Sequence, residues 1–70
     1  MTRRDGKLDI LLGKRVKIFF KDGDLYTGKL TWDSNMQSYM LNNCVNEKKG
    51  FMVGDVYFKK SHIKKMEVLR

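Results

Sequence analysis

Residues 16–33 read VKIFFKDGDLYTGKLTWD, and this stretch decides the fold. It begins with apolar side chains at every second position, a period that is typical of a half-buried strand: Val16, Ile18 and Phe20. Asp22-Gly23 then interrupts the alternation, and this dipeptide favours a tight hairpin because the turn needs a positive φ angle. The alternation resumes as far as residue 33, so the sequence predicts two antiparallel strands joined by a hairpin.

The flanking residues extend this hairpin into a meander. A short helix is predicted upstream, with Asp5 as its N-cap and Gly13 at its end. Its apolar residues are expected on one side: Leu8, Ile10, Leu11 and Leu12. The predicted elements are a helix at about 6–12 and strands at about 14–21, 25–33, 37–45, 51–59 and 63–69. We therefore expect one all-β domain over residues 1–70, with a short N-terminal α-helix and a strongly bent five-stranded antiparallel open barrel.

Several side chains have an expected place in this barrel. Gly28 lies inside a strand, which marks a bend or a close approach of two backbones. The alternation puts Trp32 on the inward face and Phe19 on the outward face. Cys44 is expected to be a small, buried and inert thiol rather than a nucleophile. Two methionines are expected to fill the core: Met36 and Met40.

Length and composition favour an oligomer. A chain of 70 residues lies near the limit at which a single core is only marginally stabilising. One Cys cannot form an internal disulfide, and one Cys with one His cannot complete a closed zinc site. An open barrel also leaves strand edges, which are templates for pairing with another chain. Association of subunits is therefore the expected source of additional stability.

The charge balance indicates a polyanionic partner. There are 15 Lys and Arg residues against 8 Asp and Glu, a formal net charge of +7. Such an excess attracts polyanions, most often nucleic acid, although a solvated basic surface is the alternative. No apolar run approaches the roughly 20 residues of a membrane helix, so no membrane partner is expected. No apolar segment of signal-peptide length follows the N-terminus, and the expected location is therefore the nucleus or the cytoplasm.

No set of residues suggests catalysis or a cofactor. His62 has no obvious carboxylate or nucleophile partner in the sequence, and turn chemistry explains the neighbouring acids Asp22 and Asp24. Residues 23–29 match the start of a phosphate-binding loop, but Leu30 stands where that motif requires a hydroxyl side chain. We expect neither an enzyme, nor a cofactor, nor a metal site.

From Leu11 to Asp33 the residues read Leu-Leu-Gly-x-x-Val-x-Ile-x-Phe-x-Asp-Gly-x-x-Tyr-x-Gly-x-Leu-x-x-Asp. This pattern closely resembles the first sequence motif of the Sm and Sm-like (LSm) proteins, and it continues to Gln37 where that family typically has Asp-x-x-Met-Asn. Residues 56–63 fall where the family's second motif, a hydrophobic residue followed by Arg-Gly, would lie. The resemblance covers residues ~8–68, and within the family it is most similar to the third D-type Sm subunit and the fourth LSm subunit.

The resemblance implies a function as well as the Sm fold, an SH3-like barrel. Sm and LSm subunits join edge to edge, the fourth strand of one pairing with the fifth strand of the next, and eukaryotic rings usually have seven members. Such rings bind U-rich single-stranded RNA around a central hole, in splicing particles or in mRNA decay. The implied partners are therefore U-rich RNA and other Sm or LSm subunits, or copies of this chain.

The resemblance also places the RNA site in two loops. The candidate RNA-binding residues are Asp33, Asn35, Met36 and Gln37 after the second strand, and Lys59, Lys60 and Ser61 before the last strand. Asn35 lies where the family places a side chain that stacks on a base, although an ordinary turn Asn is the alternative. Asp33 would orient the base-reading residue from behind, cap the turn, or do both.

Three positions depart from the family pattern. Gln37 replaces an Asn that reads a uracil edge, and its extra methylene predicts weaker or altered discrimination. Lys59 replaces an Arg, so it keeps a charge for phosphate but loses the plane that stacks. Lys60 replaces a Gly, which indicates a changed turn. Together with Lys64 and Lys65, these lysines form a predicted basic cluster, either for phosphate or as a solvated face.

The departures keep two other functions open. One is an Sm-fold module for protein–protein interaction or assembly, with little base-specific RNA binding. The other is a small SH3-like barrel from a ribosomal or other nucleoprotein, which would be monomeric when isolated. Binding of oligo-U compared with oligo-A, at two salt concentrations, separates a base-reading protein from a merely basic surface.

Overall fold

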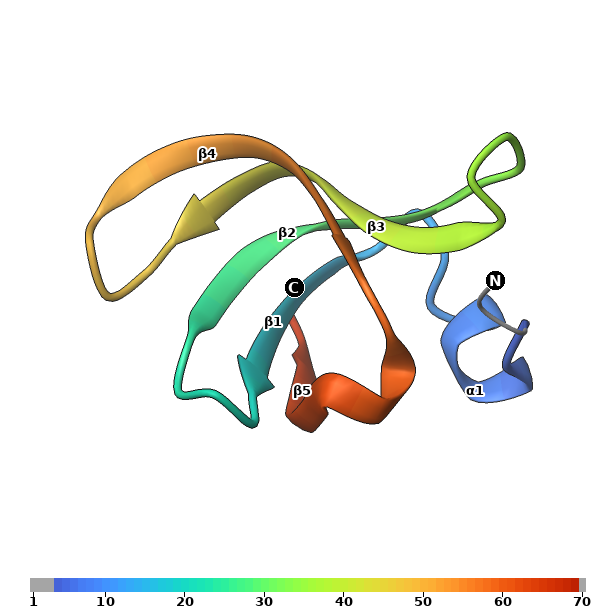
Figure 1. The fold of residues 1–70 in the computed structure, drawn as a ribbon, viewed down its shortest axis with the longest axis horizontal. Coiled ribbons are helices and arrows are strands. Elements are labelled where there is room, and N and C mark those ends of the chain that lie inside the picture. Colours follow the sequence, from blue (N-terminus) through green and yellow to red (C-terminus); the bar gives the residue numbers. More distant parts are fainter. Residues whose placement is uncertain (1–3, 70) are drawn as a thin grey trace.

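The computed structural model describes residues 4–69, in which a short helix lies beside one strongly bent sheet (Figure 1). The elements are α1 (Gly6–Asp9), β1 (Arg15–Phe20), β2 (Leu25–Asp33), β3 (Ser38–Asn46), β4 (Phe51–Phe58), the 3₁₀ turn η1 (Lys60–His62) and β5 (Ile63–Val68). The strands form a single antiparallel sheet in the order β4-β3-β2-β1-β5. The expected all-β architecture is confirmed, and the strand bounds differ from the expected ones by no more than a residue.

The β1–β2 hairpin forms as its dipeptide predicts. Gly23 has a φ of +98°, in the left-handed region that favours glycine. The Asp22 carboxylate accepts a hydrogen bond of 2.9 Å from the backbone N–H of Asp24, and the N–H of Phe20 donates to the carbonyl of Asp24 at 2.9 Å. These local bonds set the register in which Phe19 of β1 lies opposite Leu25 of β2.

Gly28 marks the bend of β2. It is buried, and the register of β2 against β3 shifts between Thr27 and Lys29. A Cβ atom at Gly28 would lie 2.9 Å from the backbone oxygen of Asn42 and 3.2 Å from the Cα of Cys44. The two backbones can approach this closely only because position 28 has no side chain, as the sequence predicts. The bend wraps the sheet around its own inner face.

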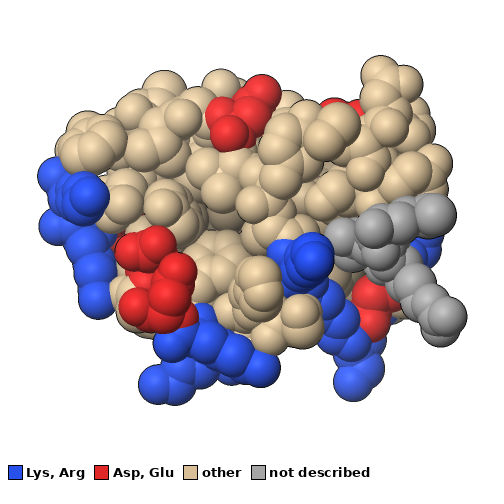
Figure 2. All heavy atoms as spheres, viewed as in Figure 1, with Lys and Arg blue, Asp and Glu red and all other residues tan. Residues whose placement is uncertain are grey.

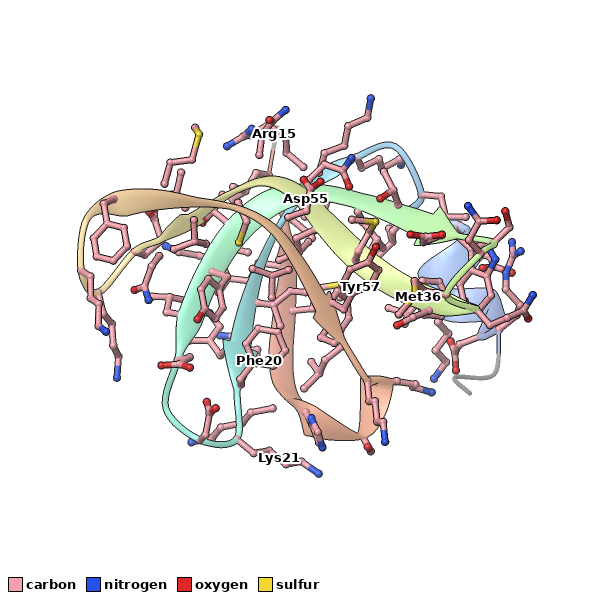
Figure 3. All side chains as sticks on the ribbon, turned by 45° about the horizontal axis from the view of Figure 1, so that its top comes forward. Arg15, Phe20, Lys21, Met36, Asp55 and Tyr57 are labelled. Atoms are coloured by element: carbon pink, nitrogen blue, oxygen red, sulfur yellow. The ribbon has the colours of Figure 1, made fainter. Side chains whose placement is uncertain are left out.

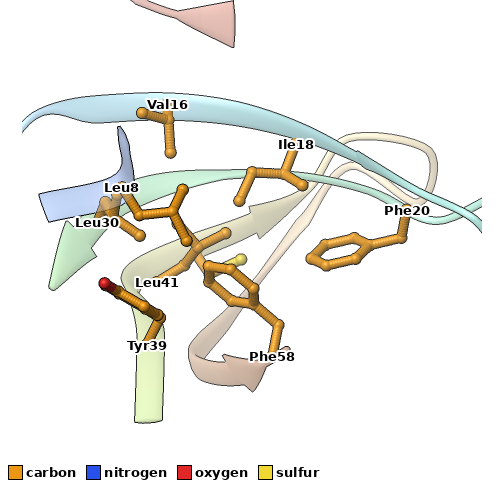
Figure 4. Close-up of a cluster of buried hydrophobic side chains, with 9 residues drawn as sticks. Leu8, Val16, Ile18, Phe20, Leu30, Tyr39, Leu41 and Phe58 are labelled. Carbon is orange, nitrogen blue, oxygen red and sulfur yellow. The ribbon is translucent and has the colours of Figure 1, made fainter. Parts of the chain in front are cut away.

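The core lies inside this wrapped sheet (Figure 4). Its fully buried side chains are Val16, Ile18, Leu30, Tyr39, Leu41 and Cys44. Phe58 and Phe20 close the core from β4 and β1, with ring centroids 5.7 Å apart in an edge-to-face arrangement. The expectation of a buried Cys44 is confirmed, and burial raises the pKa of its thiol to about 11, so the reactive thiolate is scarce at neutral pH.

Helix α1 is shorter than predicted. The Asp5 carboxylate caps it by accepting bonds from the N–H groups of Lys7 and Leu8, as expected, but the α-helix ends at Asp9. Beyond it the backbone tightens, because the N–H of Leu11 bonds to the carbonyl of Leu8, three residues back, at 2.9 Å. The helix prediction for residues 10–12 is therefore wrong, and Ile10 is 73% exposed rather than on the packed side.

The methionine and aromatic expectations have mixed outcomes. Met40 is 8% exposed, as core filler should be, whereas Met36 is 60% exposed because it lies in the β2–β3 turn, so the core prediction for Met36 is wrong. Trp32 packs against the buried ring of Tyr39 at 4.8 Å and is partly buried, which agrees with its inward assignment. Phe19 faces outward, where the Lys65 ammonium lies 5.6 Å from its ring centroid.

The two edges of the sheet are β4 and β5. Edge strand β4 carries a run of exposed apolar side chains at its start: Phe51, Met52 and Val53. Figure 2 shows an area over β3 and β4 without Lys or Arg, interrupted by an acidic group at the top, with Lys and Arg along the left and lower margins of that face. An unpaired edge with apolar side chains is suited to pairing with another strand. Among the described residues, no helix is long and apolar enough to cross a membrane.

Candidate nucleic-acid interface

The turn between β2 and β3 is shaped by Asp33. One oxygen of its carboxylate accepts hydrogen bonds from the backbone N–H groups of Asn35, at 2.9 Å, and Met36, at 3.2 Å. This is the turn-capping role that the sequence allowed for Asp33. It fixes the backbone on which the exposed side chains of Asn35 and Met36 stand.

Gln37 ends the turn in an unusual conformation. Its φ angle is +53°, in the left-handed region where residues other than Gly, Asn and Asp are uncommon. Its side-chain amide donates a 3.0 Å hydrogen bond to the carbonyl oxygen of Ser34. The group that should read a base edge is therefore folded back onto the turn, and a ligand would have to compete with Ser34 for it.

Tyr57 connects this turn to the far strand of the sheet. Its hydroxyl donates a 2.6 Å hydrogen bond to the second oxygen of Asp33, which lies two strands away. This bond lowers the pKa of the Asp33 carboxyl and raises the pKa of the Tyr57 hydroxyl. In Figure 3, Tyr57 on β4 lies on the side toward the turn that carries Met36. The structure thus brings the turn and the last residues of β4 together.

The lysines after β4 point to different places. Lys59 is exposed and extended, with φ −105° and ψ 143°, so the strand alternation continues and its side chain leaves on the same side as that of Tyr57. Lys60 instead forms an ion pair with Asp5, the N-cap of α1, and this hydrogen bond lowers the pKa of Asp5. Ser61 is exposed within η1. Of the three predicted residues in this segment, Lys59 is therefore the one that shares the side of Tyr57.

Two of the four lysines in the expected cluster form ion pairs in the structure. Lys60 is directed to the helix, while Lys65 pairs with Glu67 at 3.3 Å and lies over the ring of Phe19 on the outer face of β1 and β5. Lys60 and Lys65 therefore have different partners, and the single basic cluster of Lys59, Lys60, Lys64 and Lys65 stays a prediction.

Sequence reasoning missed two residues that organise the site, Tyr57 and Asp5. Tyr57 is 24 residues from its partner Asp33, and Asp5 is 55 residues from Lys60, so local spacing carries no sign of either contact. The available signals were indirect. Tyr57 alternates with the apolar Val56 and Phe58, which indicates an outward side chain, and Asp5 was already identified as a helix cap.

A separate recess of about 390 Å³ lies between the β1–β2 hairpin and β4. Aromatic side chains line it, including Phe20, Tyr26 and Phe58, while Asp22 and Asp24 place carboxylates at the same recess. Lys21 and His62 also line it, so the recess carries groups of both kinds and has no uniform charge. Within residues 4–69, no group of three or more His, Cys, Asp or Glu side chains could hold a metal ion.

Solved structures with the same fold come from Sm-like proteins. An Sm-like archaeal protein from Pyrobaculum aerophilum matches with a TM-score of 0.73 and 26% identity, over 91% of this chain and 49% of that one. The present chain therefore spans about half the length of that protein. An LSm protein from Methanococcus vannielii matches with a TM-score of 0.64 and 21% identity, over 87% of this chain and 88% of that one.

A third structure is the Sm protein of Pyrococcus abyssii in complex with a uridine heptamer. It matches with a TM-score of 0.67 and 15% identity, over 96% of this chain and 99% of that one. No protein-family model and no curated protein sequence matches the chain. The chain has the Sm fold, and its structural neighbours are Sm-like proteins.

Proposed function

We propose that this protein is a subunit of an Sm/LSm-type ring that binds U-rich single-stranded RNA. The observation that carries the proposal is the hydrogen bond between Tyr57 and Asp33, which joins the β2–β3 turn to the end of β4. These are the two segments in which the resemblance to Sm and LSm proteins implies that RNA is held. Asn35 and Lys59 are exposed there, beside a net charge of +7, and one structural neighbour was solved with a uridine heptamer. The proposal includes no catalysed reaction.

The ring would form through the sheet edges. The edge of β4 would pair with β5 of the next subunit, which would also cover exposed apolar side chains such as Phe51 and Met52. A seven-membered ring, built from this chain or with other Sm and LSm subunits, is the proposed assembly. Its proposed setting is RNA processing in the nucleus or cytoplasm, in a splicing particle or in mRNA decay, and the proposed kind of subunit is one that resembles a D-type Sm or the fourth LSm subunit.

Oligonucleotide binding tests this function. The affinity of the purified chain for oligo-U and oligo-A of equal length would be measured at two salt concentrations. We expect tighter binding to oligo-U at both, because base contacts persist when salt weakens the phosphate contacts. Equal affinities that disappear together at the higher salt concentration would leave only a basic surface and contradict the proposal.

A second candidate function is an Sm-fold assembly module with little base-specific binding. The specific observation in its favour is that two predicted RNA-binding side chains are already engaged: Gln37 donates to Ser34, and Lys60 pairs with Asp5. This candidate expects an oligomer through the β4 and β5 edges without preference for oligo-U. The same binding experiment, combined with the native mass, separates the two functions.

Exchanging Gln37→Asn should tighten oligo-U binding several-fold. Asn tolerates the left-handed backbone of position 37 better than Gln, and its shorter side chain restores the reach at which the family reads uracil. The change would be measured as the ratio of oligo-U to oligo-A affinities, with Gln37→Ala as the control that removes the polar group. Unchanged or weaker oligo-U binding by the Asn variant would count against position 37 as a base reader.

Asp5→Asn should steepen the salt dependence of RNA binding. Asn caps a helix about as well as Asp, so the variant removes the charge that holds Lys60 and leaves α1 capped. A freed Lys60 that meets one phosphate adds roughly 0.7 to the slope of log affinity against log salt. Asp22→Asn is the matched control, because it removes the same charge at the distant β1–β2 turn. Equal slopes for the two variants would show that Lys60 gains no phosphate contact.

A further inference from the structure

Tyr57 lies on the outer face of the sheet at the candidate RNA site. Its neighbours Val56 and Phe58 face the core, and its partner across the β3–β4 pairing is Met40, which is almost fully buried. Tyr57 itself is 47% exposed. About half of a large aromatic side chain therefore remains open to solvent, beside Met40 on the same face of the sheet.

The ring is held in one orientation. Its hydroxyl donates to Asp33 at 2.6 Å, and the other oxygen of Asp33 is occupied by the N–H groups of Asn35 and Met36. A side chain fixed at both its strand and its hydroxyl loses little conformational freedom when a ligand lies against it. The ring is thus a preorganised flat surface beside the turn.

The site otherwise lacks such a surface. Lys59 leaves β4 on the same side as Tyr57, but an ammonium group can meet a phosphate and cannot stack as a guanidinium does. Asn35 offers only a small planar amide. Among residues 4–69, the large exposed aromatic side chains are those of Phe51 and Tyr57, and Phe51 lies at the opposite end of β4. Tyr57 is therefore the aromatic surface that the turn and Lys59 share.

We infer that Tyr57 is a base-stacking platform, against which one nucleobase of a single-stranded RNA lies between the β2–β3 turn and Lys59. The inference rests on the proposed RNA-binding function and deepens it. Every base has a flat face, so stacking on Tyr57 contributes affinity without distinguishing uracil from adenine. The site would then compensate for the missing guanidinium plane at Lys59 with a phenol ring two residues earlier in the chain, on β4.

The test compares three variants of the full chain by fluorescence anisotropy with labelled oligo-U. Tyr57→Leu removes the flat ring and should weaken binding by about tenfold. Tyr57→Phe keeps the ring and loses only the bond to Asp33, so its affinity should stay within about threefold of the unsubstituted chain. Phe19→Leu is the matched control, because it makes the same aromatic-to-leucine change on the outer face of β1, outside the candidate site and the β4 edge, and it should change little. Circular dichroism and the native mass confirm that each variant is folded and assembled as before.

A strand of the same length without bases distinguishes stacking from a structural role. The penalty of Tyr57→Leu should vanish on this abasic strand, because no base is present to stack. An equal penalty on both strands would overturn the inference, as would a Phe variant as weak as the Leu variant. Oligo-U binding by Tyr57→Leu that equals that of the unsubstituted chain would overturn it while leaving the proposed function intact. An unsubstituted chain that binds no oligo-U contradicts the proposed function, and this inference with it.

Discussion

Gly28→Val should cost at least about 3 kcal/mol of unfolding free energy, a large part of the total stability of a domain of this size. The smaller Gly28→Ala change should cost about 1–3 kcal/mol. A Cβ at this position would lie 2.9 Å from the backbone oxygen of Asn42, and a backbone atom cannot turn aside as a side chain can. Relief requires β2 and β3 to separate at the bend that closes the core. Urea denaturation of each variant measures the loss.

Gly6→Ala is the matched control for this change. A Cβ at Gly6 would meet nothing within 4 Å, and the residue lies in helix α1, where Ala is favoured over Gly. The control should leave the stability unchanged or raise it by up to about 1 kcal/mol. If Gly28→Ala proved as harmless as Gly6→Ala, the close approach of β2 and β3 would not be what shapes the sheet.

Lys59→Glu should weaken oligo-U binding by about 100-fold or more. Each copy would lose a phosphate contact and place a negative charge beside the RNA backbone, and the effect repeats at every subunit that meets the same strand. The fold should be unaffected, because Lys59 is exposed and makes no ion pair within 4 Å among the described residues. Anisotropy titration with oligo-U measures the effect.

Lys49→Glu is the matched control for charge reversal. Lys49 is an exposed lysine in the β3–β4 turn, at the far end of β4 from Lys59. The Lys49→Glu substitution changes the net charge by the same amount as Lys59→Glu. It should therefore reproduce only the general electrostatic part of the loss of RNA affinity, a few-fold at moderate salt. Equal losses for the two variants would mean that RNA responds to overall charge and not to a site at the end of β4.

The strands could be predicted because each buries one face. The alternation of apolar residues predicted that Val16, Ile18 and Phe20 face the core, and all three are buried in the structure. The Asp-Gly dipeptide that follows them sets the pairing of β1 with β2. The helix was predicted too long because a leucine-rich segment can pack through an irregular turn as well as through a helix. Met36 was misplaced for a similar reason: hydrophobicity predicted burial, whereas its position in the turn decides its exposure.

The candidate site was predicted only in part. The turn and the segment after β4 could be identified from motifs, but how they meet depends on the registers of β2, β3 and β4 together. That combination places the Tyr57 hydroxyl on Asp33 and the Lys60 ammonium on Asp5. Neither contact has a local sequence signature, because the partners are far apart along the chain. The hydrogen bond that the Gln37 side chain donates to the Ser34 carbonyl, which a bound base would have to replace, is likewise visible only in three dimensions.

Native mass spectrometry of the full chain with a uridine heptamer tests the central claim most directly, because one spectrum reports both assembly and RNA binding. We expect a closed assembly of several subunits that carries the heptamer. A monomer without bound RNA, found both for the purified chain and for the protein isolated from cells with any partner chains, would contradict the claim that this protein is a ring subunit that binds U-rich RNA.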